Sequence, residues 1–137
     1  MVNTVDFELV APEELLFAER TELVVVPGAE GNFGVLPGHA PFISTLRTGV
    51  IAVYEKDAVN KRIFVSGGFA EVTPERCTVL ADEAVVLETA NRSDVENRVK
   101  AGQEVLDEAS EDEKESAAEA LGVSKALLAA LDTAGQA

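Results

Sequence analysis

The residues of this chain that could do chemistry are few, and they do not gather at metal-binding or catalytic spacing. His39 is the single histidine, inside the turn-like segment Pro37–Pro41, and no second histidine or cysteine lies near it. A metal site would therefore need distant carboxylates as its other ligands. A lone histidine among prolines and glycines is more typical of a hydrogen-bonded structural residue. We therefore predict a structural role for His39 and no metal site.

The single cysteine, Cys77, follows Arg76 in a strand-like run. Since no histidine lies nearby to activate it, the pattern favours a buried inert thiol over a nucleophile. One cysteine cannot form a disulfide within the chain, which suits a reducing compartment. Ser44 and Ser66 lack the strand–turn–helix context of a nucleophilic serine. The sequence therefore predicts no catalytic residue.

The stretch Val26–Val50 holds five of the ten glycines and three of the five prolines. Its glycines lack the Gly-Lys-Ser/Thr ending of a phosphate-binding loop, and their G-x-x-G-x-x-G spacing does not match the dinucleotide fingerprint. Glycine permits positive φ angles, whereas proline fixes φ and removes a backbone donor. The backbone must therefore turn repeatedly here, which indicates either a tight structural corner or a docking surface.

Charge and composition exclude several classes of partner. The 137 residues carry a formal net charge of −14 and a pI near 4.3. Binding of nucleic acid needs clustered lysine and arginine, and an anionic membrane surface repels an acidic protein. No stretch approaches the roughly 18 consecutive apolar residues of a spanning helix, and the first residues do not resemble a signal peptide. We expect a soluble, cytoplasmic protein that binds no nucleic acid and does not insert into the membrane.

Residues 1–88 have the pattern of a β domain. Thr4–Val10 alternates apolar and acidic residues, and Pro12 ends that run. Short runs of β character separated by glycine, proline and polar turns continue to Ala81. This pattern predicts a flattened antiparallel β-sandwich or barrel of about ten short strands. Its core is the simplest place for Phe42, Phe64 and Phe69.

Residues 89–137 have the pattern of a helical hairpin. From Asn91 onward there is no proline, and the apolar period becomes that of a helix. Ser93–Glu96 fits a capping box, and Ser110–Glu113 is a second start signal. We expect Gly122 to interrupt or end the second helix. The apolar stripe of the first helix consists of Val95, Val99, Gly102, Leu106 and Ala109. Two such helices with a tight connection predict an antiparallel hairpin.

Two segments together carry a resemblance to a known family. They are VPGAEGNFGVLPGHAPFISTLRTGVI, which begins at Val26, and FVSGGFAEVTPERCTVLADEA, which begins at Phe64. In these segments the chain resembles the epsilon subunit of the bacterial F-type ATP synthase, most strongly over residues 4–83. The resemblance implies a non-catalytic rotor subunit of the central stalk. Such a subunit couples proton flow through the membrane sector to ATP synthesis, at the cytoplasmic face of the inner membrane.

The resemblance also implies two docking surfaces, one for the polar loops of the c-ring and one for the gamma subunit. The residues expected at the c-ring are Glu30, Gly31, Asn32, Phe33 and His39. The residues expected at gamma are Phe42, Ser44, Leu46, Ser66, Gly68 and Glu71. Family members often carry an acid where this chain has Asn32. The charged contact is then replaced by a neutral hydrogen bond or shifted to Glu30.

In the family, the hairpin regulates ATP hydrolysis at the alpha/beta head and in some members binds ATP. Here the nucleotide motif falls on Ala90–Val95, which lacks the aspartate and has Asp94 where an arginine belongs. A negative side chain at that place repels phosphate. The second helix offers only Lys114 and Lys125 for contact with an acidic head. We therefore expect no ATP cofactor and at most weak inhibition.

Two other classes of function stay open at this point. One is a stand-alone β-sandwich binding module whose helical hairpin dimerises through Val95, Val99, Leu106 and Leu128. The other is a single-metal barrel enzyme that uses His39 and nearby acids. Neither explains the glycine- and proline-rich stretch.

Overall fold

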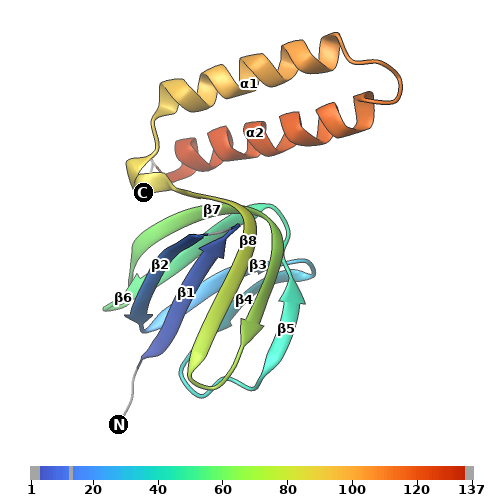
Figure 1. Cartoon of the computed structure of the whole chain (residues 1–137). Coiled ribbons are helices and arrows are strands. Elements are labelled where there is room, and N and C mark those ends of the chain that lie inside the picture. The colour runs from blue at the N-terminus through green and yellow to red at the C-terminus, as the bar shows by residue number, and fades with distance from the viewer. Residues whose placement is uncertain (1–3, 13, 135–137) are drawn as a thin grey trace. The chain divides into compact units, whose positions relative to one another are not determined.

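The computed structural model describes residues 4–12 and 14–134. The chain divides into two compact units, Met1–Glu88 and Thr89–Ala137. The first is built of strands and the second of helices (Figure 1). The fold class predicted from the sequence, a β-sandwich followed by a helical hairpin, is thereby confirmed.

The described part of the first unit contains eight strands in one sheet rather than about ten separate short strands. They are β1 Val5–Ala11, β2 Glu14–Thr21, β3 Leu23–Gly28, β4 Gly31–Val35, β5 Phe42–Thr45, β6 Gly49–Glu55, β7 Ala58–Val72 and β8 Arg76–Val86. The number is smaller because β7 continues through the glycine pair Gly67 and Gly68 instead of ending there. β8 likewise runs on beyond Ala81.

Strand β7 is shared by two parts of the sheet. The sheet order is β2-β1-β8-β7-β6-β3-β4, and β5 pairs with β7 outside this path. The first half of β7 pairs with β6, from Ala58 to Val65, and the second half pairs with β5, from Phe69 to Val72. A sheet that exchanges one neighbour for another along a single strand bends there, and it folds back on itself as a sandwich (Figure 1).

The sheet departs from the predicted antiparallel arrangement at one place. β1 pairs with β8 in parallel, with Phe7 opposite Cys77 and Leu9 opposite Val79. The other strand pairs between described residues are antiparallel. A parallel pair needs a long connection instead of a hairpin. Here six strands separate β1 from β8 in sequence, so the chain has ample length to return in the same direction.

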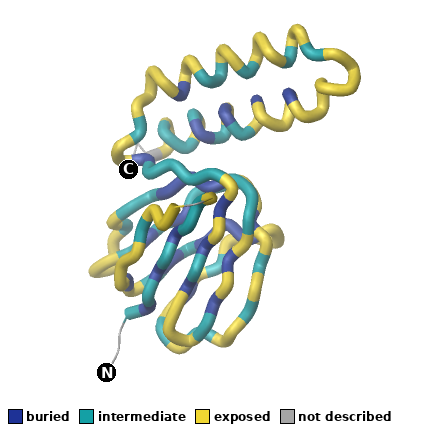
Figure 2. The backbone as a smooth tube through the Cα atoms, viewed as in Figure 1, coloured by how far each residue is buried: buried dark blue, intermediate teal, exposed yellow. Residues whose placement is uncertain are grey.

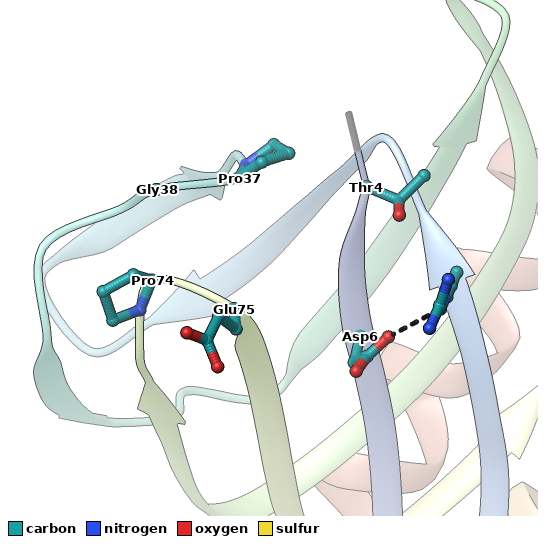
Figure 3. A pocket seen from close by; sticks show the side chains of 7 residues that line it. Thr4, Asp6, Pro37, Gly38, Pro74 and Glu75 are labelled. Atoms are coloured by element: carbon teal, nitrogen blue, oxygen red, sulfur yellow. Dashed lines mark ion pairs between the residues drawn. The ribbon is translucent and has the colours of Figure 1, made fainter. Parts of the chain in front are cut away.

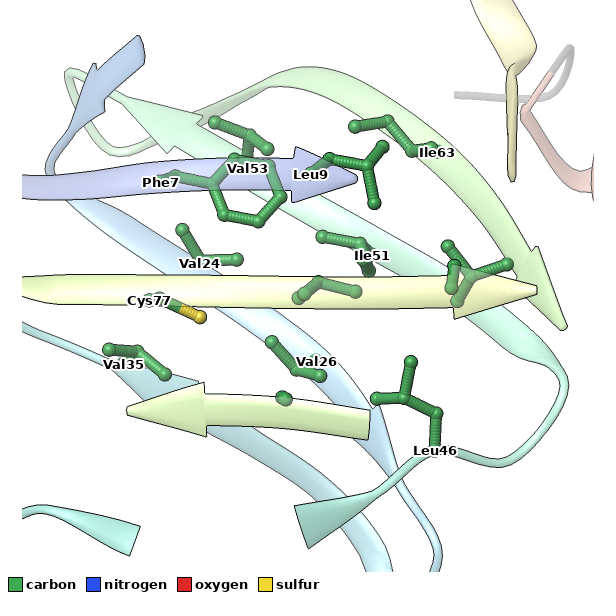
Figure 4. Packing of buried hydrophobic residues seen from close by; sticks show 14 of the residues in the cluster. Phe7, Leu9, Val24, Val26, Val35, Leu46, Ile51, Val53, Ile63 and Cys77 are labelled. Carbon is green, nitrogen blue, oxygen red and sulfur yellow. The ribbon is translucent and has the colours of Figure 1, made fainter. Parts of the chain in front are cut away.

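Side chains of both layers meet in one core (Figure 4). The alternation predicted for β1 is confirmed, because Val5, Phe7 and Leu9 are fully buried while the acids between them face outward. Cys77 belongs to this core as a free thiol. Burial raises its pKa to about 12, so the thiol stays protonated at neutral pH. That environment matches the inert cysteine predicted from the sequence.

Gly67 and Gly68 let β7 and β8 approach without breaking their pairing. Both glycines have positive φ, +69° and +100°. A Cβ on Gly68 would lie 1.9 Å from the carbonyl oxygen of Leu80. The register is nevertheless the same on both sides, with Ser66 opposite Glu83 and Gly68 opposite Ala81. The double glycine therefore kinks a continuous strand instead of ending it.

The second unit consists of helices α1 Arg92–Asp107 and α2 Lys114–Ala134, and the short 3-10 helix η1 Leu87–Thr89 spans the boundary between the units. The predicted capping box at Ser93 is wrong. Asn91 is the N-cap, and its side-chain oxygen accepts a hydrogen bond of 3.1 Å from the Asp94 backbone N–H. Asparagine caps a helix as well as serine does, and the earlier start brings Arg92 into the first turn.

The interruption expected at Gly122 is also wrong, because α2 runs through it. One glycine costs a helix about 1 kcal/mol relative to alanine, and packing on both sides of it outweighs that cost. Leu121, just before Gly122, and Leu127, just beyond it, are both buried. Gly102, on the predicted stripe of α1, leaves room for Leu121, whose Cδ1 would lie 3.3 Å from a Cβ at that place.

Gly68 in β7 and Gly122 in α2 give a matched pair of substitutions. We expect Gly68→Ala to lower the free energy of unfolding of the β unit by about 3 kcal/mol, because of its positive φ and the clash with the Leu80 carbonyl. Gly122→Ala, which meets open space inside α2, should instead gain about 1 kcal/mol in the hairpin. Urea unfolding followed by circular dichroism measures both changes. Equal stability of the Gly68→Ala variant and the parent would contradict the close approach of the strands.

Candidate docking surfaces

In the described part of the chain, the residues that could do chemistry do not gather into a metal centre. Within residues 4–12 and 14–134, no group of three or more His, Cys, Asp or Glu side chains could hold a metal ion. His39 Nδ1 lies 2.8 Å from the carbonyl oxygen of Ala40 and donates to it. Its ring also lies against Phe42, with 5.1 Å between the ring centroids. In the same part of the chain, no helix is long and apolar enough to cross a membrane.

The residues expected at the c-ring divide into an exposed turn and a ring cluster behind it. The β3–β4 turn has Ala29 and Glu30 at its tip, between Gly28 and Gly31, which pair with each other. Glu30, Gly31 and Asn32 are all exposed. Gly31 has a φ of +138°, which disfavours any other residue there.

The ring cluster consists of Phe33, His39 and Phe42, all half-buried. The Phe33 and Phe42 rings meet edge to face, 4.9 Å apart. Phe33 and Phe42 also pack against the core. The cluster therefore brings together residues that the sequence analysis assigned to two different surfaces, and it supports the turn from behind.

Arg47 is a feature of the turn that sequence reasoning missed. Its Nη1 donates to the Gly28 carbonyl oxygen at 2.7 Å, and its Nη2 donates to Asn32 Oδ1 at 2.5 Å. Its backbone N–H also donates to the Pro27 carbonyl oxygen at 3.0 Å. Arg47 lies fifteen residues beyond Asn32, so no short-range pattern connects the two. The Gly28–Leu46 bridge between strands is what brings them together.

A second surface is an apolar row across the outside of the sheet, which we call the outer row. It consists of Leu15, Val10, Leu80 and Phe69, each opposite the next on strands β2, β1, β8 and β7. The side chains of Leu15, Leu80 and Phe69 are 56%, 38% and 39% exposed. Buried positions alternate with half-buried or exposed ones along β1, the end of β7 and the start of β8 (Figure 2). Phe69 therefore faces solvent, contrary to the core position expected for it, whereas Phe64 is in the core as expected.

Acidic side chains border the outer row. A hollow of about 370 Å³ opens along it. Its walls are formed by Val10, Ala11, Pro12, Gly68, Phe69, Leu80, Ala81 and Asp82. In the next cross-strand row, Glu8 and Glu71 lie on either side of Thr78, and Ile43, which is 66% exposed, lies opposite Glu71. The surface therefore has an apolar centre and an acidic border.

The residues expected at gamma do not form one surface. Leu46 is buried in the core, so its side chain is not available to a partner of this unit. Phe42 and Ser44 are half-buried on the inward face of β5, and Ser44 Oγ donates to the Thr45 carbonyl oxygen at 3.0 Å. Glu71 is exposed on the outward face. Ser66 and Gly68 are half-buried in the middle of β7.

An open hollow of about 430 Å³ lies near the start of β1 (Figure 3). Its walls are formed by Thr4, Asp6, Arg20, Pro37, Gly38, Pro74 and Glu75. Arg20 pairs with Asp6 across 3.3 Å, and both side chains are largely in solvent. Ion pairs of this kind contribute little to stability. We assign no ligand to this hollow.

Arg92 and Arg98, near the start of the hairpin, are bonded to neighbouring side chains. Arg92 pairs with Asp132 of α2 and lies 3.8 Å from Glu96. The hydrogen bond and charge of Asp132 raise the pKa of Arg92 above its ordinary value. Arg98 Nε donates to Ser124 Oγ at 2.9 Å. Asp94, which stands where the resemblance implies an arginine, is exposed in the same turn of α1 as Arg92.

Comparison with known proteins identifies the family. Residues 4–86 match the family model described as ATP synthase, Delta/Epsilon chain, beta-sandwich domain. The ATP synthase epsilon chain of Rhodospirillum rubrum is 55% identical over 131 residues, which cover 95% of this chain and 98% of that protein. The epsilon chain of Paramagnetospirillum magneticum is 46% identical over 132 residues, or 96% and 99% of the two chains.

A solved structure agrees on the fold. A chain in the structure of Euglena gracilis mitochondrial ATP synthase (OSCP/F1/c-ring in rotational state 1) aligns with a TM-score of 0.77 at 23% identity. The alignment covers 96% of this chain and 83% of that one. The resemblance seen in the two glycine-containing segments is thus confirmed along nearly the whole sequence. This chain belongs to the family of ATP synthase epsilon chains.

Proposed function

We propose that this chain is a non-catalytic rotor subunit of the F-type ATP synthase. In this role it docks on the gamma subunit and on the c-ring, at the cytoplasmic face of the bacterial inner membrane. It couples proton flow through the membrane sector to ATP synthesis in the head. The observation that carries this proposal is the outer row, which crosses four adjacent strands and exposes the large apolar side chains of Leu15, Leu80 and Phe69. A continuous apolar patch of this kind indicates a surface for another protein.

Gamma is the partner that we assign to the outer row. The four strands are hydrogen-bonded to one another, so the row is rigid and loses little entropy when a partner covers it. Aromatic and large aliphatic side chains at the centre of an interface provide most of its binding energy. Glu8 at the border already pairs with Arg76 at 3.4 Å, whereas Glu71 and Asp82 call for basic groups on gamma. Of the residues that the resemblance implied for gamma, Gly68 and Glu71 lie in this surface.

The c-ring is the partner that we assign to the β3–β4 turn. The turn is short and carries Glu30, Gly31 and Asn32 in exposed positions. Phe33 and His39 lie in the ring cluster, and the Phe33 ring packs beside Gly28 at the base of the turn. A narrow, exposed turn with one acid suits contact with polar loops.

We propose that the hairpin inhibits ATP hydrolysis only weakly and binds no ATP. Asp132 and Glu96 already neutralise Arg92, and Arg98 is bonded to Ser124. A phosphate group would have to displace these partners in the presence of Asp94. α2 offers the acidic head only Lys114 and Lys125, and Lys114 already pairs with Glu111 at 2.9 Å.

The gamma contact is tested with a charge placed in the outer row. Phe69→Asp should raise the Kd for purified gamma at least about thirtyfold, since central apolar residues of interfaces contribute about 2 kcal/mol or more. Val105→Asp places the same charge at another exposed apolar residue, 60% exposed on α1, and serves as the matched control. Gel filtration and titration calorimetry measure complex formation. Equal binding of gamma by the parent and both variants would show that the outer row is not the surface that binds gamma. A parent that binds only to itself and not to gamma would refute the rotor assignment.

The nucleotide prediction concerns the purified full chain. Titration calorimetry with ATP should give a Kd weaker than about 1 mM, which corresponds to about 4 kcal/mol of binding free energy. Asp94→Arg restores a cation where nucleotide-binding relatives carry one, and it should bind more tightly than the parent. A micromolar Kd for the parent would contradict the proposal. Asp94→Asn, which removes the charge without adding a cation, is the control.

A further inference from the structure

The β3–β4 turn is held from outside by one side chain. The Arg47 guanidinium donates to the Gly28 carbonyl oxygen at the start of the turn and to Asn32 Oδ1 at its end, over 2.7 and 2.5 Å. A planar guanidinium presents several donors in a fixed fork, so it can fix two acceptors at once. The backbone adds two bonds, from Arg47 N–H to Pro27 and from the Ala29 N–H to the Thr45 carbonyl oxygen at 2.9 Å.

The turn needs such support because of its own sequence. Its two tip residues lie between Gly28 and Gly31, and glycine loses more conformational freedom on ordering than any other residue. Without an external bond, a partner that binds the tip would have to order it first. The connection that carries Arg47 packs closely against β3, because a Cβ on Gly49 would lie 2.9 Å from the Pro27 Cβ.

The two polar side chains of the turn, Glu30 and Asn32, differ in whether they are bonded within the chain. The side-chain oxygen of Asn32 accepts from Arg47 and is occupied within the chain. Glu30 is exposed, and among the described residues its carboxylate has no hydrogen-bond or ion-pair partner. The turn therefore offers one free negative charge at its tip, and Asn32 helps to hold the backbone beneath it.

We propose that Arg47 is the positioning residue of the β3–β4 turn, and that Glu30, rather than Asn32, is the side chain that the turn presents to the c-ring. This inference rests on the proposed function, because it assigns the contact within the surface proposed there. The group that it faces on the ring is a cation or a strong hydrogen-bond donor, which pairs with a carboxylate. Arg47 acts through the turn and touches no partner itself.

Two measurements on the full-length protein separate positioning from contact. Amide hydrogen exchange reports whether the turn is ordered, and the Ala29 amide is the probe, with the core amide of Val24 as internal reference. Binding is measured to purified gamma and to a gamma–c-ring subcomplex. The ratio of the two Kd values gives the gain in affinity that the ring contributes, and this gain is compared between variants. The variants are Arg47→Ala, Arg47→Lys, Asn32→Ala and Glu30→Gln. Arg20→Ala removes an exposed arginine from another edge of the sheet and is the matched control.

We expect Arg47→Ala to speed exchange at Ala29 about tenfold while Val24 stays unchanged. The gain from the ring should fall about threefold to tenfold, and binding to gamma alone should not change. Arg47→Lys should give intermediate values, because a compact ammonium group lacks the planar fork of donors that reaches two acceptors at once. Asn32→Ala should resemble Arg47→Ala, and the double variant should be no worse than either. Glu30→Gln should lose the gain from the ring with unchanged exchange.

Several results would overturn the inference. Unchanged exchange at Ala29 in Arg47→Ala would refute the positioning role whatever the ring does. Full ring binding by Glu30→Gln, together with a loss in Asn32→Ala at unchanged exchange, would make Asn32 the contact. If the parent gains nothing from the ring, the proposed ring docking fails and the assignment of Glu30 fails with it. The exchange data would then still decide whether Arg47 orders the turn.

Discussion

Strand β7 pairs with β8 along most of its length, and it exchanges β6 for β5 as its second neighbour partway along. The rest of the β unit depends on this shared pairing, because it bends the sheet into two layers that enclose one core. The exchange is possible only where the backbones of β7 and β8 come very close, at Gly67 and Gly68. A side chain there would meet the Leu80 carbonyl oxygen or the Asp82 side chain. Two residues without Cβ atoms are therefore required by the architecture itself.

This architecture positions both proposed docking surfaces. The bend brings β8 and the second half of β7 beside β1 and β2, and their outward side chains line up as the outer row. It also brings the end of β5 to the end of β3, through the Gly28–Leu46 bridge, and so delivers Arg47 to the β3–β4 turn. One surface is broad, apolar and built on strands. The other is narrow, polar and held by side-chain hydrogen bonds, so the two suit partners of different chemistry.

Sequence patterns predicted what depends on neighbouring residues. The alternation of Val5, Phe7 and Leu9, the two helices and the buried thiol of Cys77 follow from local periodicity and environment. The start of α1 was misjudged by two residues, since Asn91 and Ser93 are both good caps and only packing chooses between them. Gly122 was expected to break α2, but burial of the residues beside it outweighs its low helix propensity.

Features that join distant parts of the chain could not be predicted from local patterns. The parallel pairing of β1 with β8 has no hairpin to mark it, and the bond from Arg47 to Asn32 exists only because two turns are adjacent in space. The outer row was missed for the same reason. An apolar residue such as Phe69 or Leu80 is core or surface according to the face on which its strand places it, and the kink at Gly67 and Gly68 decides that face. The family resemblance pointed to the segment that contains the turn, but it could not show that the side chain of Asn32 is bonded within the chain.

Cysteine cross-linking in the assembled synthase tests most directly whether one small domain engages two partners through two separate surfaces. The buried Cys77 leaves a thiol introduced by Phe69→Cys or Glu30→Cys as the reactive one contributed by this chain. A maleimide that carries a photoreactive benzophenone bonds to the introduced thiol and, on illumination, to C–H bonds of whatever lies beside it. It should then link Phe69→Cys to gamma and Glu30→Cys to the c-ring, with neither thiol reaching the other partner. If both thiols link to the same partner, or both react with a soluble maleimide as fast in the complex as in the isolated chain, the two-surface assignment is wrong.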